Sequence, residues 1–303
     1  MPGRGPMTVG RDMRVRGLLA VLVLLLSTLL LALPSSAIAY ADAAACPAQV
    51  AALDANQAKI AAHNKLLPPS GVAPPEVAGP VNREADQLNA EKDGLLASLA
   101  RCEAVVDKLR DNGPAPKPLS EKNSQAMARA TAAARPRWQN PTPPVKMSDG
   151  RVTIPRNHPL RPLWDIVKKL QNPMADYPLV PLQGEQPPKP DAKHASGYEV
   201  GTRVVKGENV PAISPDHIVP KVEILYLPRF LELTPENQWE VLNAPINLQW
   251  LPSEVNAQNK NSKSAEDMKG VDSDWQQEQI ALQDRKRKEL TDLIAQLADS
   301  QVR

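Results

Sequence analysis

Two stretches of regularly spaced apolar residues predict a helical hairpin across residues 46–112. Within each stretch the apolar positions advance alternately by three and four residues, which keeps them on one face of a helix. Between the stretches lies the run from Pro68 to Pro75, which a helix cannot cross. We therefore expect two antiparallel helices. Their apolar stripes include Val50, Leu53, Ile60 and Leu67 in the first helix and Leu88, Leu95, Leu99, Val106 and Leu109 in the second.

The two cysteines fall on these stripes. Residues that face each other in an antiparallel hairpin have position numbers with a nearly constant sum, and this rule places Cys46 opposite Cys102. The chain contains only these 2 cysteines, so a disulfide between them is predicted if the protein is exported. The alternative is that they are separate thiols packed as small core residues.

The longest apolar run, Gly17 to Leu33, lies near the start of the chain. Arginines precede it and the small residues around Ala39 and Ala43 follow it, which is typical of a signal peptide spanning residues 1–45. We expect a secreted or cell-envelope protein. The alternative is an uncleaved anchor, in which case the membrane would be a partner.

Residues 113–195 differ in composition from the rest of the chain. They hold 16 of the 32 prolines, a density that predicts a mainly extended linker with short helices at 120–134 and 162–170. The linker has 13 basic and 6 acidic residues, a net charge of +7, whereas residues 196–303 have 12 and 17, a net charge of −5. A basic segment beside an acidic module could hold a polyanion near a site, or it could be a solvated spacer.

Residues 196–303 form the last predicted module. The stretch from Gly197 to Val210 is typical of a small β-hairpin, and Thr234 followed by Pro235 predicts a helix start. Apolar spacing from about Asp274 to Ser300 predicts a long final helix. Together with the hairpin of residues 46–112, these elements predict an α+β fold class.

The candidate chemistry is concentrated in the same module. Asp216 and His217 open the run DHIVP, and Asn247, Asn256 and Lys260 follow at intervals. Phosphodiester hydrolysis needs an activated water and charge neutralisation at the phosphate. An acidic residue, a histidine, amide side chains and lysines can supply these functions.

Over about residues 196–270, this order and spacing resembles the HNH/endonuclease VII superfamily of nucleases, in its toxin-like branch. The resemblance implies a ββα-metal domain in which Asp216 binds a divalent cation and His217 is the general base. It also implies that Asn247 orients the imidazole through a hydrogen bond and that Asn256 completes the metal shell on the finger helix. Members of the family often have a lysine three residues after the last ligand. Here that position is Asn259, so Asn256 and Asn259 remain alternative ligands.

Three charged residues near the motif have two interpretations each. Lys260 and Lys263 are expected to approach substrate phosphate, and the alternative is that they are solvated helix lysines. Glu223 could support the metal site from behind, and the alternative is a surface carboxylate. No cysteines lie in this region, so the metal is expected to be held by oxygen and nitrogen ligands, which suits Mg²⁺ or a similar ion such as Mn²⁺.

The predicted function is that of a secreted, metal-dependent endonuclease acting on DNA or RNA, with a toxin-like role and a cognate immunity protein as a partner. The hairpin is a candidate for binding a protein partner or for self-association. A different hypothesis is a non-enzymatic envelope protein with a coiled-coil stalk and a degenerate, binding-only cap. The sequence shows no evident aromatic platform for stacking bases, which favours recognition of the nucleic-acid backbone.

Overall fold

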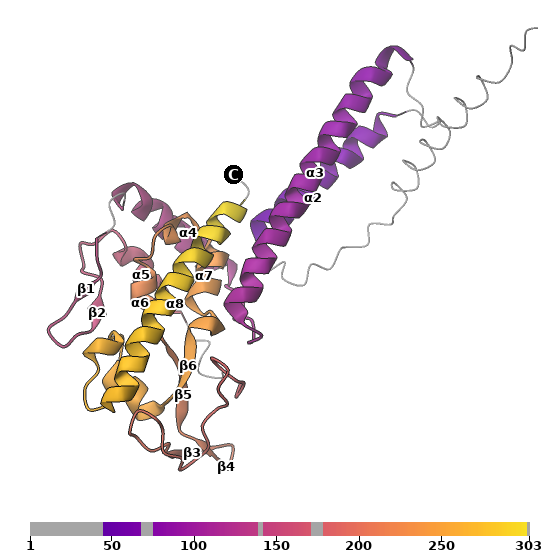
Figure 1. Ribbon diagram of the computed structural model, residues 1–303. Helices are drawn as coiled ribbons and strands as arrows, with labels where there is room; N and C mark the ends of the chain where they lie inside the picture. Colours follow the sequence, from indigo (N-terminus) through magenta and orange to yellow (C-terminus); the bar gives the residue numbers. More distant parts are fainter. Residues whose placement is uncertain (1–44, 68–74, 139–141, 171–177, 302–303) are drawn as a thin grey trace, which may run out of the picture. The chain divides into compact units, whose positions relative to one another are not determined.

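The computed structural model describes residues 45–67, 75–138, 142–170 and 178–301 (Figure 1). The predicted signal peptide therefore lies almost entirely outside the described residues. Within the described ranges, no helix is long and apolar enough to cross a membrane. The described chain combines helices with small antiparallel strand pairs, a disulfide and a long C-terminal helix.

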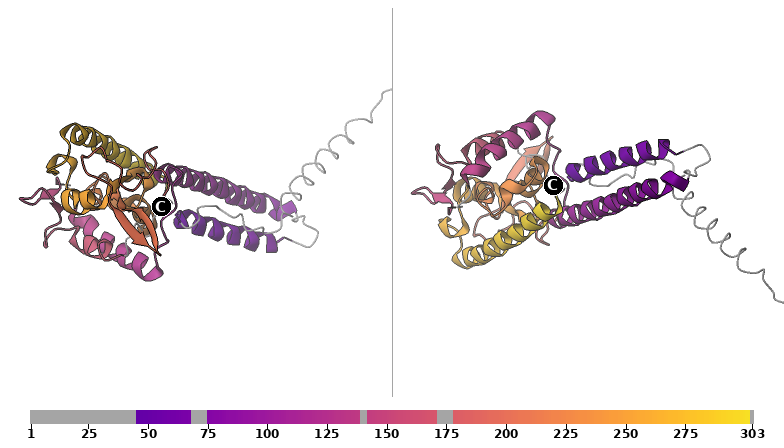
Figure 2. Two further views of the ribbon diagram at one scale, coloured as in Figure 1. Left: turned by 90° about the horizontal axis from the view of Figure 1, so that it is seen from below. Right: turned by 90° about the horizontal axis from the view of Figure 1, so that it is seen from above.

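The predicted helical hairpin is confirmed. Helix α2 (Pro47–Lys65) and helix α3 (Pro75–Arg110) lie side by side (Figure 2). Lys59 pairs with Glu91 at 2.8 Å and His63 with Glu84 at 3.1 Å, as the antiparallel register requires. Cys46 and Cys102 form the predicted disulfide, and both residues are fully buried.

Removing this disulfide is expected to destabilise the protein. The bond joins residues 56 positions apart. Closing such a loop lowers the conformational entropy of the unfolded chain, which stabilises the folded protein by about 4 kcal/mol in the chain-entropy model. The double variant Cys46→Ser, Cys102→Ser should lose free energy of unfolding of about that size in urea titrations. Dithiothreitol should lower the stability of the parent and leave the double variant unchanged. Equal stability of parent and variant would contradict a structural role for the bond.

Polar contacts attach the disulfide end of the hairpin to the C-terminal elements. The side chains of Gln49 and Ser98 both donate to the carbonyl of Ser300, the last residue of helix α8 (Ser273–Ser300). Arg110 forms an ion pair with Glu240 at 2.9 Å, on helix α7 (Pro235–Leu242). The hairpin is therefore joined to the two helices that flank the candidate motif.

Residues 113–195 differ from the predicted extended linker, because much of the segment packs against the C-terminal elements. The two short helices expected within it are present, as α4 (Glu121–Ala134) and α5 (Arg161–Val167). Thr131 of α4 shares a buried hydrogen bond with Gln238, and Arg135 donates to the carbonyl of Leu231. Proline limits regular structure here, but Met127, Leu160 and Leu163 still bury their side chains. The remaining elements of the segment are η1 (Arg135–Arg137), β1 (Val145–Lys146) and β2 (Val152–Thr153).

The predicted β-hairpin near residue 200 is also confirmed. It consists of β3 (Thr202–Val205) and β4 (Glu208–Pro211), joined through Lys206 and Gly207 at positive φ. The Asp216-His217 pair, however, lies on a separate strand, β5 (Ile213–His217), which pairs antiparallel with β6 (Leu248–Pro252). The sequence pattern had not predicted β6, whose five residues are all buried and lack polar alternation.

Helices surround this strand pair. Thr234 caps α7 as expected, because its hydroxyl accepts a hydrogen bond from the backbone N–H of Asn237, and α8 covers the predicted final helix. Of the apolar residues expected on one side of α8, Trp275, Leu290, Leu293, Ile294 and Leu297 are buried. The short elements between these helices are α6 (Lys221–Ile224), η3 (Phe230–Glu232), η4 (Pro245–Asn247), η5 (Val255–Lys260) and η6 (Ala265–Asp267).

Candidate functional site

A cavity of about 320 Å³ lies where β5 ends, and it brings most of the predicted site together. Asp216 and His217 line it from β5, and Asn256 and Lys260 line it from η5. The register of the strand pair sets Asp216 opposite Gln249 and His217 opposite Leu248. Because η5 follows β6 after only two residues, the chain order strand, strand, helix places side chains from positions 216–217 and 256–260 around one space.

Asp216 is a buried carboxylate with few partners. Its side chain is 5% exposed, and Oδ2 accepts a long hydrogen bond of 3.4 Å from Gln249. Burial raises the pKa of Asp216 to about 6, although the nearby positive charge of Lys260 and the Gln249 hydrogen bond act in the opposite direction. A carboxylate that is costly to ionise in the free protein is suited to gain a cation.

His217 is held in place by a hydrogen bond to the insert, residues 218–247, which lies between strands β5 and β6. Its Nε2 lies 3.0 Å from the carbonyl oxygen of Leu242, the last residue of α7. A carbonyl can only accept, so Nε2 carries the proton and Nδ1 of the neutral ring keeps its lone pair. Burial, followed by the positive charge of Lys221, holds the pKa of His217 well below its usual value. The imidazole is therefore neutral near pH 7 and can accept a proton at Nδ1.

Asn247 has a different role from the one predicted. It does not orient the imidazole, which is bonded to Leu242. Instead, its fully buried amide accepts from the backbone N–H of Val219 at 2.8 Å and donates to the carbonyl of the same residue at 2.9 Å. The backbone N–H of Ile218 also donates to the Asn247 carbonyl. Asn247 therefore fixes the chain directly after His217, at the point where the strand pair opens into the insert.

The structure distinguishes the two candidate asparagines, Asn256 and Asn259, which both lie in η5. Asn256 lines the cavity, and its Nδ2 donates to Ser214 Oγ at 2.9 Å, which leaves its amide oxygen without a hydrogen bond among the described residues. Asn259 does not line the cavity, and its amide donates to the hydroxyl of Tyr198. The segment is wound as a π-helix, a form that is often found at functional sites. Of the two asparagines, Asn256 is therefore the better-placed candidate for a metal ligand.

Lys260 and Lys263 separate in space. Lys260 lines the cavity but is only 3% exposed, and its ammonium donates to the carbonyl of Ile218 at 2.9 Å and to Gln283 at 3.2 Å. Burial lowers the pKa of Lys260, and the negative charge of Asp216 opposes that shift. Lys263 lies outside the cavity lining and pairs through its backbone with Arg151. A phosphate contact thus stays a prediction for Lys260, and the geometry does not favour one for Lys263.

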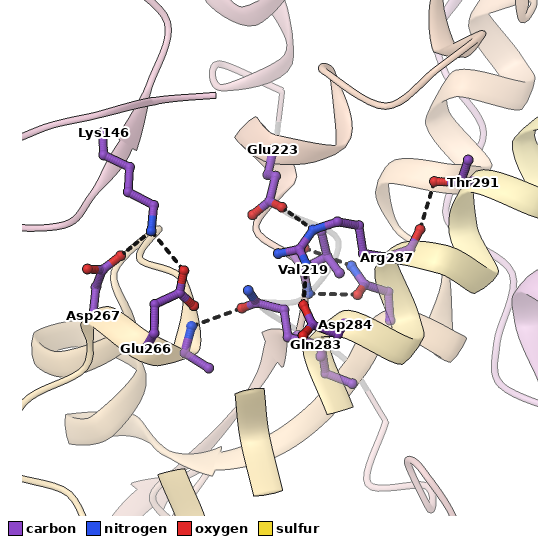
Figure 3. A network of polar contacts seen from close by, with 12 residues as sticks. Lys146, Val219, Glu223, Glu266, Asp267, Gln283, Asp284, Arg287 and Thr291 are labelled. Atoms are coloured by element: carbon purple, nitrogen blue, oxygen red, sulfur yellow. Dashed lines mark hydrogen bonds and ion pairs between the residues drawn. The ribbon is translucent and has the colours of Figure 1, made fainter. Parts of the chain in front are cut away.

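Glu223 is neither a cavity residue nor a surface carboxylate. It is 5% exposed and forms an ion pair with Arg287 of α8 at 2.6 Å (Figure 3). Its second oxygen, Oε2, is buried without a hydrogen-bond partner among the described residues. The negative charge of Glu223 also helps to stabilise the positive charge of the neighbouring Lys260. Glu223 therefore supports the site through the charge balance around Lys260.

Lys221 and Trp164 are among the cavity residues that were not predicted from the sequence. Lys221 directly follows the DHIVP run, donates to Asn243 at 3.0 Å and lies 5.9 Å from the centre of the Trp239 ring. Burial lowers its pKa to about 8, so it remains mainly protonated near pH 7. Trp164 comes from α5, inside the segment predicted as a linker. The position of Lys221 beside the motif was a usable signal, whereas Trp164 had none.

The oxygen donors of this cavity could hold a hard cation. Asp216 offers a carboxylate and Asn256 an amide oxygen, and the described residues contain no cluster of three or more His, Cys, Asp or Glu side chains suited to a metal. Such a site would therefore have few protein ligands and would rely on water and substrate oxygens. Comparison with known proteins gives no match, whether with a family model, a curated protein or a solved structure.

Proposed function

We propose that this protein is a metal-dependent nuclease of the HNH/endonuclease VII type that hydrolyses phosphodiester bonds in DNA or RNA. The observation that carries the proposal is the meeting of three groups in one cavity: the buried carboxylate of Asp216, the amide oxygen of Asn256 and the neutral imidazole of His217. The order β5, β6, η5 supports it, because it is the ββα order that the motif implies.

His217 is the proposed general base. Its Nδ1 takes a proton from a water molecule, whose oxygen attacks the phosphorus as the bond to the departing 3′ oxygen breaks. The carbonyl of Leu242 stabilises the imidazolium that forms, since it accepts the Nε2 proton. Lys221 supplies a positive charge at the same cavity for a phosphate oxygen. General base catalysis of this kind typically contributes about 10²–10⁴-fold to the rate.

Asp216 and Asn256 are the proposed holders of the metal, most simply Mg²⁺ or Mn²⁺. Hard oxygen ligands fit these ions, which keep several waters and commonly bind through one or two protein groups plus phosphate. The high pKa of Asp216 agrees with a carboxylate whose negative charge has no full partner in the free protein. Bound there, the metal would polarise a phosphate oxygen and stabilise charge in the transition state.

We further propose that the nuclease acts outside the producing cytoplasm as a toxin-like effector, with an immunity protein protecting the producer. The disulfide supports a non-reducing environment, since such bonds persist mainly in exported proteins. The proposed signal peptide would deliver the chain there.

The alternative of a binding-only envelope protein retains one argument in its favour. Lys260 is internally hydrogen-bonded, and Asp216 is the only carboxylate among the described residues that line the cavity, which is a sparse donor set for a catalytic metal. Metal and nucleic-acid binding without cleavage would favour this alternative.

The deciding experiment is a cleavage assay on the purified, oxidised protein. We expect single-stranded DNA, plasmid DNA or RNA to be cut when Mg²⁺ or Mn²⁺ is present and to stay intact in EDTA. Restoring the metal after EDTA should restore the activity. Intact substrates with every tested ion, at a protein concentration where binding is saturated, would rule out the nuclease.

A further inference from the structure

Trp164 has the properties of a ligand-binding aromatic residue. Of the five tryptophans, Trp239 and Trp250 donate their indole N–H to backbone carbonyls at 2.8 and 2.9 Å. Trp138 and Trp275 pack edge-on against other rings. The indole of Trp164 has neither a ring contact nor a hydrogen bond within the described ranges, it is partly exposed, and it lines the cavity that holds Asp216 and His217.

The indole is nevertheless held on a fixed support. Leu163 and Val167, on either side of Trp164 in α5, are buried at 0% and 4% exposure. Arg161, at the start of α5, anchors the helix by donating a hydrogen bond to the carbonyl of Ile154 at 2.9 Å. A partly exposed ring on a packed helix can present a flat apolar surface at little cost in conformational entropy.

The size of the cavity restricts what the ring can meet. At about 320 Å³ it lies at the lower end of the range for small-molecule sites, roughly 300–1,000 Å³. A cavity of this size can take a single nucleotide but not both strands of a duplex. A base could reach the Trp164 face only if it were unpaired or turned out of the stack.

We propose that Trp164 stacks on a nucleobase next to the scissile phosphate, so that the preferred substrate is single-stranded or locally unpaired nucleic acid. This inference rests on the proposed nuclease function and names its substrate class. It also revises the expectation, drawn from the lack of an evident aromatic platform in the sequence, that recognition of the nucleic-acid backbone is favoured over contact with the bases. A stacked base is sequence-tolerant, since every base offers a π face, so low sequence specificity is still expected.

The test is a binding cycle between the tryptophan and the base. In a His217→Ala background, which is expected to slow cleavage strongly, fluorescence anisotropy would compare oligothymidylate with an abasic strand of equal length. With Trp164 present, the abasic strand should bind about 5- to 150-fold more weakly, the range for loss of one base–aromatic stack. With Trp164→Ala the two strands should bind equally, and Trp164→Phe should restore part of the difference.

Trp138→Ala is the matched control, because Trp138 packs against His158 and Tyr226 and does not line the cavity. It should leave the difference between the two strands unchanged. The inference is overturned if the strands bind equally to the protein with Trp164, if Trp164→Ala weakens both by the same factor, or if neither binds. Cleavage that depends on His217 while the strands bind equally would overturn this inference alone. If the preference for the strand with bases depends on Trp164 but the parent protein cuts no substrate, the proposed nuclease function is overturned instead.

Discussion

Replacing His217 with alanine is expected to reduce phosphodiester cleavage by about 10²–10⁴-fold, while the affinity for nucleic acid stays within a few-fold of the parent. The loss would follow because Nδ1 is the proposed proton acceptor and Nε2 is already hydrogen-bonded to the Leu242 carbonyl. Initial rates at saturating substrate would be measured in Mg²⁺ for both proteins. An unchanged rate would remove His217 from the mechanism.

Two further measurements separate chemistry from folding. Added imidazole should partly restore the His217→Ala rate, because the vacated space can admit a free base, and the rescue should grow with the neutral imidazole fraction as pH rises through about 7. His63→Ala is the matched histidine control, since His63 pairs with Glu84 on the hairpin and does not line the cavity. It should cut at the parent rate. A comparable loss in this control would point to a general effect on folding.

The neutral state of His217 gives this prediction a pH dependence. Because burial keeps the imidazole pKa well below its usual value, the base is already deprotonated through the neutral range. Activity should therefore not fall between pH 8 and pH 7 through titration of His217. A fall centred at the ordinary histidine pKa, about 6.5, would show that the imidazole is solvated during turnover.

Elements with local signals could be predicted from the sequence. The spacing of apolar residues located α2, α3 and α8, the Thr234-Pro235 pair located α7, and the alignment of the two stripes located the disulfide. Each of these depends on neighbours a few residues apart or on a simple antiparallel register. The local pattern was therefore enough.

The elements that the sequence did not predict depend on distant partners. Strand β6 is buried along its whole length, so it shows no alternation, and it is defined by pairing with β5 across an insert of 30 residues, 218–247. The proline-rich segment was expected to be an extended linker, yet Trp239 and Trp250 donate to its backbone at Lys117 and Val180. Tertiary contacts of this kind leave no periodic signal.

The candidate site divides in the same way. Asp216, His217 and Asn256 were predicted from the order and spacing of a sequence motif, and the structure brings all three to one cavity. The His217 imidazole is hydrogen-bonded to the backbone carbonyl of Leu242, and a backbone partner cannot be predicted from residue type. Asn247 was predicted to orient the imidazole, but its side chain is hydrogen-bonded to the backbone of Val219, a role that depends on the fold.

Replacing Asp216 with asparagine is expected to abolish most metal-dependent cleavage and, at the same time, to stabilise the metal-free protein above pH 6. The carboxyl pKa is raised to about 6 from 3.8, so the folded state resists ionisation of this group. In the parent, stability falls as pH rises from about 4 to 6 and the cost persists at higher pH. Asparagine has the same shape and no charge, which removes a cost of up to about 3 kcal/mol.

Thermal or urea unfolding at pH 4 and pH 7.5 in EDTA would measure the stability cost of the ionised Asp216 directly. The variant should exceed the parent in free energy of unfolding at pH 7.5 and match it at pH 4, where Asp216 is mainly protonated in the folded protein. Adding Mn²⁺ at pH 7.5 should stabilise the parent by mass action and leave the variant unchanged. Cleavage should fall by about 10³-fold, several kcal/mol of transition-state stabilisation.

Glu254→Gln is the matched control, since Glu254 is an exposed carboxylate just before η5 and does not line the cavity. It should show neither the gain in stability nor the loss of metal response. If Asp216→Asn keeps the parent's stabilisation by Mn²⁺, the metal binds elsewhere and Asp216 is only a buried acid. If the variant loses stability at pH 7.5, the carboxylate is instead paired in solution, most directly with the ammonium of Lys260. The two results therefore separate a cation site from an internal ion pair.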